Sequence, residues 1–185
     1  AFAGGIFVTA VLREGPRLRL RKADFDDLDF IMDLQHDAEN SPYIVAFDRD
    51  FHTKVMEIGK ASMDVIVEEK ATGDRVGYFL VNGLTNEAHE MEWTHVIMAK
   101  KGMGYGHEAM KLLKAWAFED KKFHRVWLDC KDYNARALHL YESEGMVREG
   151  LIRETLLTNG VYENLVVLGI LDREYEQRKR EGKEL

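Results

Sequence analysis

Three glycines at alternate positions mark a loop suited to an anion, in the segment Lys101-Gly102-Met103-Gly104-Tyr105-Gly106. Glycine has no side chain to cover the backbone, so its N–H groups can approach an anion closely. A helical pattern follows, and the free N–H groups and positive dipole end of a helix start also attract phosphate. The loop is therefore a candidate phosphate site. A glycine triplet is also typical of flexible turns, and this spacing is not a dinucleotide fingerprint.

A second pair of polar residues lies on a helical pattern downstream of the loop. Asn134 and Tyr141 are seven residues apart, which corresponds to two helical turns, or roughly 10 Å along one face. One extended ligand could contact both side chains. The helix pattern alone gives each residue a structural role instead, with Asn134 as the N-cap and Tyr141 as a packing residue.

Candidate bases lie on the strand-like run 90–98, which precedes the glycine loop. Strict alternation would place Glu90, Glu92 and Thr94 on one face of this strand and His95 on the other. A glutamate on this face could act as a general base. It could equally be a solvated or ion-paired surface residue.

The sequence contains no pattern for a metal site or a nucleophilic thiol. The single cysteine, Cys130, alternates with Val126 and Leu128, which is typical of a buried small hydrophobe. One cysteine also excludes an internal disulfide framework and a multi-cysteine metal site. The histidines show no metal-ligand spacing with other ligands, so we expect no metal. A reducing, cytoplasmic setting is the default for such a chain.

The elements that must position these residues follow from hydrophobic patterning. Strands are expected at 17–21, 63–69, 75–82, 90–98, 124–130, 152–157 and 161–170. Helices are expected from Asp24, at 47–60, after the glycine loop, at 135–144 and, as a frayed polar tail, from Asp172. Asn159-Gly160 predicts a tight hairpin turn between the last two strands. This order predicts an α+β domain with a mostly antiparallel sheet and helices on its faces.

Length and composition fit one globular domain. The chain has 185 residues, of which 45% are hydrophobic and only 2 are proline. A net charge of -7 argues against a general nucleic-acid binder. The apolar segment Ala1–Leu12 is far shorter than a membrane span and has no basic flank before it. We expect a processed end or an appended remnant there rather than a signal peptide, and we expect no membrane partner.

The glycine loop and the later helix together resemble the GNAT acetyltransferases. The family's acetyl-CoA loop reads (Gln/Arg)-x-x-Gly-x-(Gly/Ala), and its later helix reads Asn-x-x-Ala-x-x-Leu-Tyr-x-x-x-Gly-Phe. Lys101, Gly104 and Gly106 lie at the loop positions, and the residues that match the helix are Asn134, Ala137, Leu140, Tyr141 and Gly145. The departures are Lys101 for Arg or Gln, Met98 where Pro is common, and Met146 for Phe. Lysine keeps the positive charge but loses the bidentate fork of arginine.

The likeness extends from about Arg17 to Tyr175. The last hairpin, Thr158–Asn164, is similar to the branch that contains ribosomal-protein N-terminal acetyltransferases and spermidine N-acetyltransferase. The resemblance implies the GNAT fold, a mixed and mostly antiparallel sheet of six to seven strands with helices on both faces. The domain would then span residues 17–175, between an N-terminal extension at 1–16 and a polar tail at 176–185.

The resemblance also implies an N-acetyltransferase that moves an acetyl group from acetyl-CoA to a primary amine by direct attack. Tyr141 would protonate the departing thiolate, and Glu92 would serve as the base, because many relatives have a carboxylate on this strand. The implied acetyl-CoA contacts are Ile97, Met98, Lys101, Gly102, Met103, Gly104, Tyr105, Gly106, His107 and Asn134. The alternative is a non-catalytic acyl-CoA-binding or sensing module. A homodimer is compatible with either function.

Acidic residues gather where relatives of this fold border the acceptor entrance. Residues 24–50 contain nine acids and a single base, Arg49. This imbalance predicts a cationic acceptor, either a polyamine or a protein N-terminus, bound by Asp33, Asp37 and Glu39. Acids on exposed helix faces that only keep the protein in solution explain the same pattern equally well.

Overall fold

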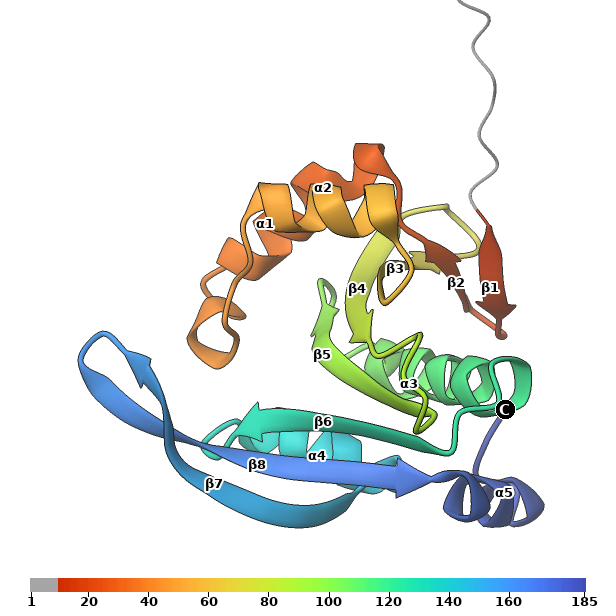
Figure 1. Cartoon of the computed structure of the whole chain (residues 1–185). Helices are drawn as coiled ribbons and strands as arrows, with labels where there is room; N and C mark the ends of the chain where they lie inside the picture. Colours follow the sequence, from red (N-terminus) through yellow and green to blue (C-terminus); the bar gives the residue numbers. More distant parts are fainter. Residues whose placement is uncertain (1–9) are drawn as a thin grey trace, which may run out of the picture.

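The computed structural model describes residues 10–185, which form an eight-stranded sheet flanked by helices (Figure 1). The strands are β1 (Val11–Glu14), β2 (Leu18–Lys22), β3 (Ser62–Glu69), β4 (Arg75–Asn82), β5 (Glu90–Met98), β6 (Arg125–Lys131), β7 (Val147–Thr158) and β8 (Val161–Leu171). Their order across the sheet is β1-β2-β3-β4-β5-β6-β8-β7. Every neighbouring pair is antiparallel except β5 and β6, which run parallel.

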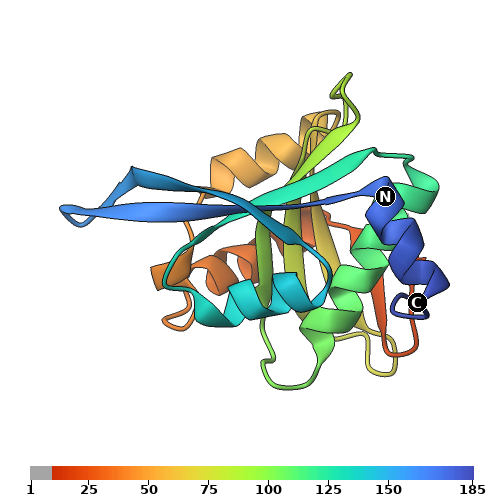
Figure 2. The same cartoon turned by 90° about the horizontal axis from the view of Figure 1, so that it is seen from below.

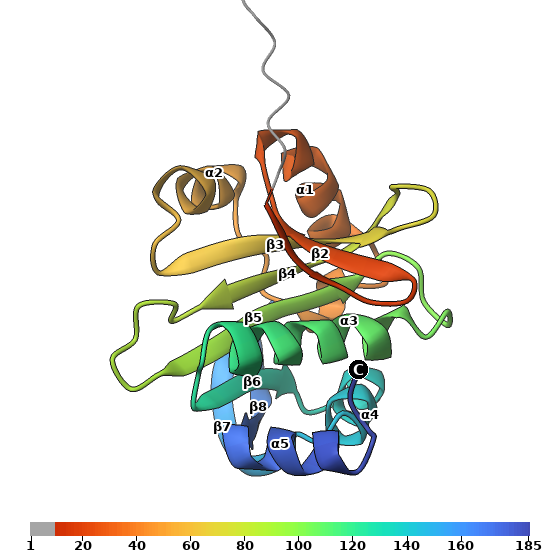
Figure 3. The ribbon, with the colours of Figure 1, turned by 90° about the vertical axis from the view of Figure 1, so that its right-hand side faces the viewer.

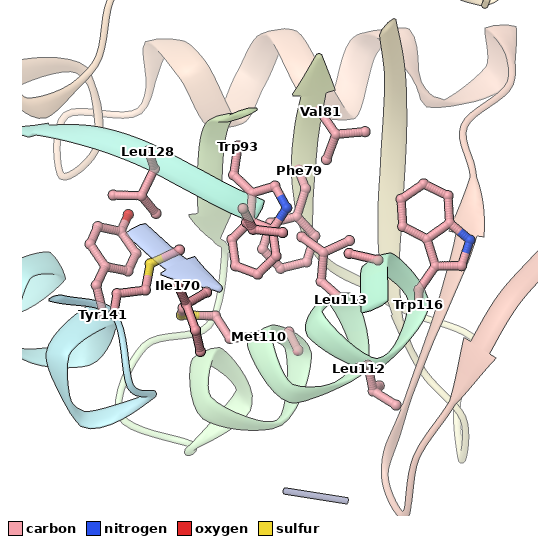
Figure 4. Packing of buried hydrophobic residues seen from close by; sticks show 14 of the residues in the cluster. Phe79, Val81, Trp93, Met110, Leu112, Leu113, Trp116, Leu128, Tyr141 and Ile170 are labelled. Carbon is pink, nitrogen blue, oxygen red and sulfur yellow. The ribbon is translucent and has the colours of Figure 1, made fainter. Parts of the chain in front are cut away.

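Helices cover both faces of the sheet (Figure 3). They are α1 (Leu28–His36), α2 (Arg49–Ile58), α3 (Tyr105–Ala115), α4 (Ala135–Ser143) and α5 (Asp172–Arg180), with short turns at Phe25–Asp27, Ser41–Tyr43 and Trp116–Asp120. One core cluster lies between the sheet and α1 and α2, and a larger one lies beneath α3, α4 and α5. Figure 4 shows Tyr141 beside Leu128 at one end of the larger cluster and Trp116 at the other.

These elements confirm the predicted α+β class, with one strand more than expected. The additional strand is β1, which pairs with β2 and lies inside the segment 1–16 that the sequence pattern placed in an extension. Four residues are too few to show a clear alternation, so pairing with β2 rather than local pattern defines this strand. Residues 1–9 of the predicted extension lie outside the described residues.

The C-terminal segment is a helix with a buried anchor, not a frayed end. Tyr175 of α5 is fully buried, stacks on Phe118 with ring centroids 5.0 Å apart, and donates a hydrogen bond to Glu119. Beyond α5, the Glu184 carboxylate bonds the buried Lys114 ammonium of α3 at 2.6 Å. The sequence pattern indicated a frayed polar tail, because the partners of Tyr175 and Glu184 lie more than fifty residues earlier in the chain.

The parallel pair β5 and β6 is joined only at its beginning. Glu90, Met91 and Glu92 pair with Arg125, Val126 and Trp127, and no pairing between the two strands follows. Figure 1 shows the strands separating from that point. Beyond Glu92, the edge of β5 that faces β6 therefore has no strand partner, and its backbone groups are available to a ligand.

A β-bulge in β5 changes which of its residues share a face. Val81 pairs with Trp93 while Leu80 pairs with His95, so Thr94 is an extra residue in β5. An extra residue of this kind interrupts the alternation of the strand. Its position, two residues past the last pairing with β6, coincides with the opening between the two strands.

The bulge overturns the face that strict alternation predicted for His95. Trp93 belongs to the core beneath α3, whereas Ile97 belongs to the core beneath α1 and α2. His95 faces this second core, since its Nε2 donates to the Val45 carbonyl at 2.9 Å. Glu92 pairs with Asn82 and lies on the same face of the sheet as His95.

Candidate active site

A cleft of about 1000 Å³ opens where β5 and β6 separate. Its walls come from β5, the glycine loop, the start of α3, β6, α4 and the connection between α1 and α2. The two catalytic candidates, Glu92 and Tyr141, both line this cleft. Tyr141 approaches from the α3 and α4 side of the sheet, while Glu92 projects to the α1 and α2 side. Because the strands are apart here, the two sides communicate through the gap.

The glycine loop presents a series of free donors to the cleft. None of the backbone N–H groups from Gly102 to His107 donates a hydrogen bond within residues 10–185. Gly102 and Gly104 adopt φ of 77° and 72°, which a residue with a side chain reaches only at a cost. Such a run of amides at a helix start fits the pyrophosphate of acetyl-CoA.

Arg17 holds the opposite side of this loop. Its guanidinium donates to the carbonyls of Met103 at 2.9 Å and Gly104 at 3.3 Å, and to the Glu108 carboxylate at 2.8 Å. The carbonyls therefore point toward Arg17, which leaves the N–H groups free for the cleft. Motif matching missed Arg17, because it lies more than eighty residues before the loop.

Lys101, the positive residue of the loop motif, contacts the connection between α1 and α2. Its Nζ lies 2.6 Å from Asn40 Oδ1 and 3.1 Å from Glu39 Oε2. Lys101 and Glu39 both line the cleft. The structure thus pairs a predicted cofactor residue with a predicted acceptor residue.

The other predicted cofactor residues except Met103 line the cleft, but not all through their side chains. Ile97 is buried beneath α1 and α2, and the Tyr105 hydroxyl bonds Glu69, so these two can offer only backbone groups. Gly106 packs against α4, where an added Cβ would lie 3.1 Å from Leu140. The Met103 side chain is exposed outside the cleft.

Met98, His107 and Asn134 complete the predicted cofactor set, and all three line the cleft. His107 Nδ1 lies 2.8 Å from Glu144, at the end of α4. Asn134 Oδ1 accepts from the Ala137 N–H at 3.2 Å, so the side chain caps α4. The structural role that the helix pattern favoured for Asn134 is therefore present, together with its place at the cleft.

Tyr141 carries an unpaired hydroxyl in a buried position. The residue is 7% exposed, and no group within residues 10–185 forms a hydrogen bond with its oxygen. Burial, together with the nearby Cys130 and Asp129, raises the pKa of Tyr141 well above its ordinary value. The phenol therefore keeps its proton at neutral pH and can donate it to a group in the cleft.

Cys130 does not offer an alternative nucleophile. It is 7% exposed, in agreement with the buried position predicted from its alternation. Burial raises the pKa of the Cys130 thiol to about 12, so the reactive thiolate is scarce at neutral pH.

Glu92 lies where β5 and β6 separate, and a series of hydrogen bonds between side chains holds it. Its Oε1 accepts from Thr94 Oγ1 at 3.0 Å, and Thr94 in turn accepts from the Asn82 amide. Burial raises the pKa of Glu92, and the neighbouring Asp129 and Glu90 add to the increase. A carboxylate with a raised pKa is a stronger base.

Asp129 is a second carboxylate that sequence reasoning missed. It lies two residues past Trp127, the β6 residue paired with Glu92, so it shares the face of Glu92 and lines the cleft. Desolvation raises the pKa of Asp129. The sequence of β6 shows an alternating pattern, which does not indicate a functional carboxylate. The position of Asp129 near Glu92 follows only from the β5–β6 register.

Most acids of residues 24–50 have structural partners. Asp27 is fully buried between Arg21 and Arg75, and the Asp48 side chain caps α2. Asp33 and Asp37, two of the three predicted acceptor residues, lie outside the cleft. Within this segment, the predicted acceptor residue that reaches the cleft is Glu39.

Residues 10–185 contain no cluster of side chains that could hold a metal ion. Nor does any helix in that range have the length and apolar character to cross a membrane. The cytoplasmic location stays a prediction.

A donor-rich loop, an open strand edge and a long cleft together form a site suited to an extended ligand that carries phosphate groups. A family model described as an acetyltransferase (GNAT) domain matches residues 17–147, more than half of the chain. The chain therefore belongs to the GNAT acetyltransferases, and the resemblance drawn from the two motifs is confirmed.

Curated relatives are similar in sequence to part of this chain. A probable N-acetyltransferase, YjcK of Bacillus subtilis, is 30% identical over 120 residues, covering 65% of this chain and 58% of its own length. The spermidine N(1)-acetyltransferase of Vibrio cholerae is 30% identical over 95 residues, covering 50% of this chain and 55% of its own length. This chain thus spans little more than half the length of these relatives.

Solved structures share the fold over most of their length. A Vibrio cholerae spermidine N-acetyltransferase in complex with CoA and spermine matches with a TM-score of 0.76 and 24% identity, covering 88% of this chain and 99% of that one. A GNAT acetyltransferase of Bacillus anthracis matches with a TM-score of 0.75 and 23% identity, covering 86% and 98%. These matches establish the GNAT fold that the motifs implied.

Proposed function

We propose that this protein transfers the acetyl group of acetyl-CoA to a primary amine, with a polyamine or a protein N-terminus as the favoured acceptor. One observation carries the proposal. The unpaired Tyr141 hydroxyl, the free amides of the glycine loop and the Glu92 carboxylate line one cleft at the point where β5 and β6 separate.

The cleft has the polarity that this reaction needs. Lys100, Lys101 and the loop amides lie at one end and suit the phosphates of acetyl-CoA. Glu92 and Asp129 lie where the strands separate and suit an ammonium group. Lys131 also lines the cleft, but Glu163 neutralises it at 2.8 Å. The relatives named as spermidine acetyltransferases support a cationic acceptor.

In the proposed reaction the amine nitrogen attacks the thioester carbonyl carbon, the C–N bond forms and the C–S bond breaks. The ammonium group of a lysine-like amine has a pKa near ~10.4, so it must first lose a proton. Glu92 receives this proton, directly or through a water molecule. Tyr141 donates its proton to the departing sulfur, and the second proton of the attacking nitrogen restores the Tyr141 hydroxyl. The high pKa of the buried Cys130 thiol favours this direct transfer over an acetylated cysteine.

An amine panel tests the proposal against the alternative of a non-catalytic acyl-CoA-binding module. Thiol release from acetyl-CoA would be measured with spermidine, a basic peptide and a neutral-bodied amine. We expect turnover, with the highest kcat/KM for the cationic acceptors. Tight CoA binding by calorimetry without thiol release for any amine would favour the binding module instead.

A further inference from the structure

The connection between α1 and α2 joins both walls of the cleft. We call residues 38–47 the strap. On the glycine-loop side, Lys101 bonds Asn40 and Glu39. On the β6 side, Lys131 Nζ and the Tyr133 hydroxyl donate to the Pro42 carbonyl at 2.9 and 2.8 Å. Figure 1 shows the strap in orange beside the open ends of β5 and β6.

The two partners of Lys101 in the strap differ in how firmly their side chains are held. Asn40 is 8% exposed, and its amide also donates to the Leu34 carbonyl at 2.9 Å, so it is fixed. The Glu39 side chain is 75% exposed and meets Lys101 at 3.1 Å. Glu39 is therefore the partner that can leave, and its charge is neutralised by Lys101 while the pair persists.

We propose that the Glu39–Lys101 pair couples the two substrate sites, so that CoA and a cationic amine each strengthen the binding of the other. This inference rests on the proposed function. A pyrophosphate on the free amides of Gly102 to His107 attracts the Lys101 ammonium away from Glu39. The released carboxylate then faces the cleft without a partner and attracts the cationic amine.

The reverse order has the same result. A cation bound to Glu39 releases Lys101 for the phosphates, and linkage requires the two effects to be equal. An exposed ion pair contributes little free energy, so the coupling should be a factor of about three at low salt. Added salt should reduce it by screening the exposed charges.

Calorimetry with two ligands that cannot react tests the coupling. Spermidine would be titrated into the full chain with and without saturating CoA, which has no acetyl group to transfer. For the natural sequence, we expect the spermidine Kd to fall by a factor of about three when CoA is bound. In Glu39→Gln and in Lys101→Gln, CoA should leave the spermidine Kd unchanged.

Asp33→Asn provides the matched control. It removes the same charge from the same acidic region, but Asp33 is exposed and lies outside the cleft, so the coupling factor should persist. An equal spermidine Kd with and without CoA in the natural sequence would overturn the coupling. So would a coupling factor that survives in Glu39→Gln.

Failure of the proposed function has a different signature, namely no CoA binding and no thiol release with any amine. Loss of coupling alone would leave turnover intact. Absence of spermidine binding in both states would overturn the coupling and the cationic acceptor together, while turnover with a neutral-bodied amine would still support the acetyltransferase.

Discussion

The Tyr141 side chain is buried at the cleft, and no group in the described part of the chain bonds its hydroxyl, which makes it the sharpest test at the scale of single residues. Tyr141→Phe should lower kcat by roughly 100-fold or more, because a proton donor is lost from the transition state. Stability and CoA affinity should hardly change, because no hydrogen bond is lost. Steady-state kinetics, thermal unfolding and calorimetry measure the three quantities.

Tyr175→Phe is the matched control for this change. The Tyr175 hydroxyl donates to Glu119 at 2.6 Å, and neither residue lines the cleft. Its removal should lower stability and leave kcat within a few-fold. If Tyr141→Phe keeps kcat within a few-fold as well, another group protonates the sulfur and Tyr141 is a packing residue.

Glu92 gives a second prediction, on pH. Because its pKa is raised above the ordinary 4.5 by burial, kcat/KM should fall on the acid side at a pH above the ordinary glutamate range. Only the deprotonated form accepts a proton from the amine. Glu92→Gln should remove this acid limb and lower kcat, typically by at least 100-fold. A full pH profile of both proteins would decide.

The raised pKa of Glu92 that favours its role as a base makes the ionised Glu92 unfavourable for the stability of the fold. The folded state holds the Glu92 proton more tightly than the unfolded chain, so this group contributes stability below about 4.5 and loses it as pH rises through the folded pKa. At pH 7, Glu92→Gln should therefore be as stable as the natural sequence or more so. Loss of both stability and activity would indicate a structural role.

At the scale of elements, the conformation of the glycine loop depends on Arg17, which precedes β2. Arg17→Met removes the guanidinium that bonds the Met103 and Gly104 carbonyls. The loop then loses its fixed orientation, and the Kd for CoA should rise about tenfold. Calorimetry with CoA measures the change.

Arg19→Met is the control, at a β2 residue two positions after Arg17. Arg19 bonds Glu68 and not the loop, so its loss should leave CoA affinity unchanged. Equal CoA affinity in natural protein and Arg17→Met would mean that the loop keeps its conformation through its own glycines.

At the scale of the whole molecule, the C-terminal segment closes the larger core. Lys114 is fully buried, and Glu184 is one of the two carboxylates that neutralise it. Glu184→Gln should destabilise the protein by about 2 kcal/mol, since a buried charge loses part of its compensation. Denaturant unfolding measures this. Glu181→Gln, an exposed change in the same segment, should have no effect.

The β7–β8 hairpin leads to a prediction about assembly. The 12-residue strand β7 is the edge of the sheet, with Leu151, Ile152 and Leu157 at 53%, 46% and 62% exposure. The hairpin extends past the helices (Figure 2). Long apolar edge strands pair with another chain, and two copies can pair symmetrically, so we propose a homodimer through β7.

Light scattering after gel filtration tests this assembly. Ile152→Glu should shift the dimer to monomer, while Val11→Glu, at the opposite edge of the sheet, should not. A natural protein that is monomeric at every concentration would contradict the proposed homodimer through β7.

Local patterns in the sequence determined most of the elements and the family. The glycine loop, the Asn134 cap and the Asn159-Gly160 turn are each encoded within a few residues, and the structure contains all three at the expected places. The spacing between Asn134 and Tyr141 predicted one shared ligand path, and both line the cleft. Such features depend on backbone preferences and helical periodicity, which a single sequence displays directly.

The tertiary structure decided where the site's charges meet. The β5–β6 register brings Asp129 beside Glu92, the bulge at Thr94 turns His95 to their face, and the strap brings Glu39 to Lys101. Each of these contacts joins segments separated by tens of residues, or depends on one extra residue in a strand. Periodicity carries no information on strand neighbours or on which distant charges pair, because packing of the whole sheet sets both.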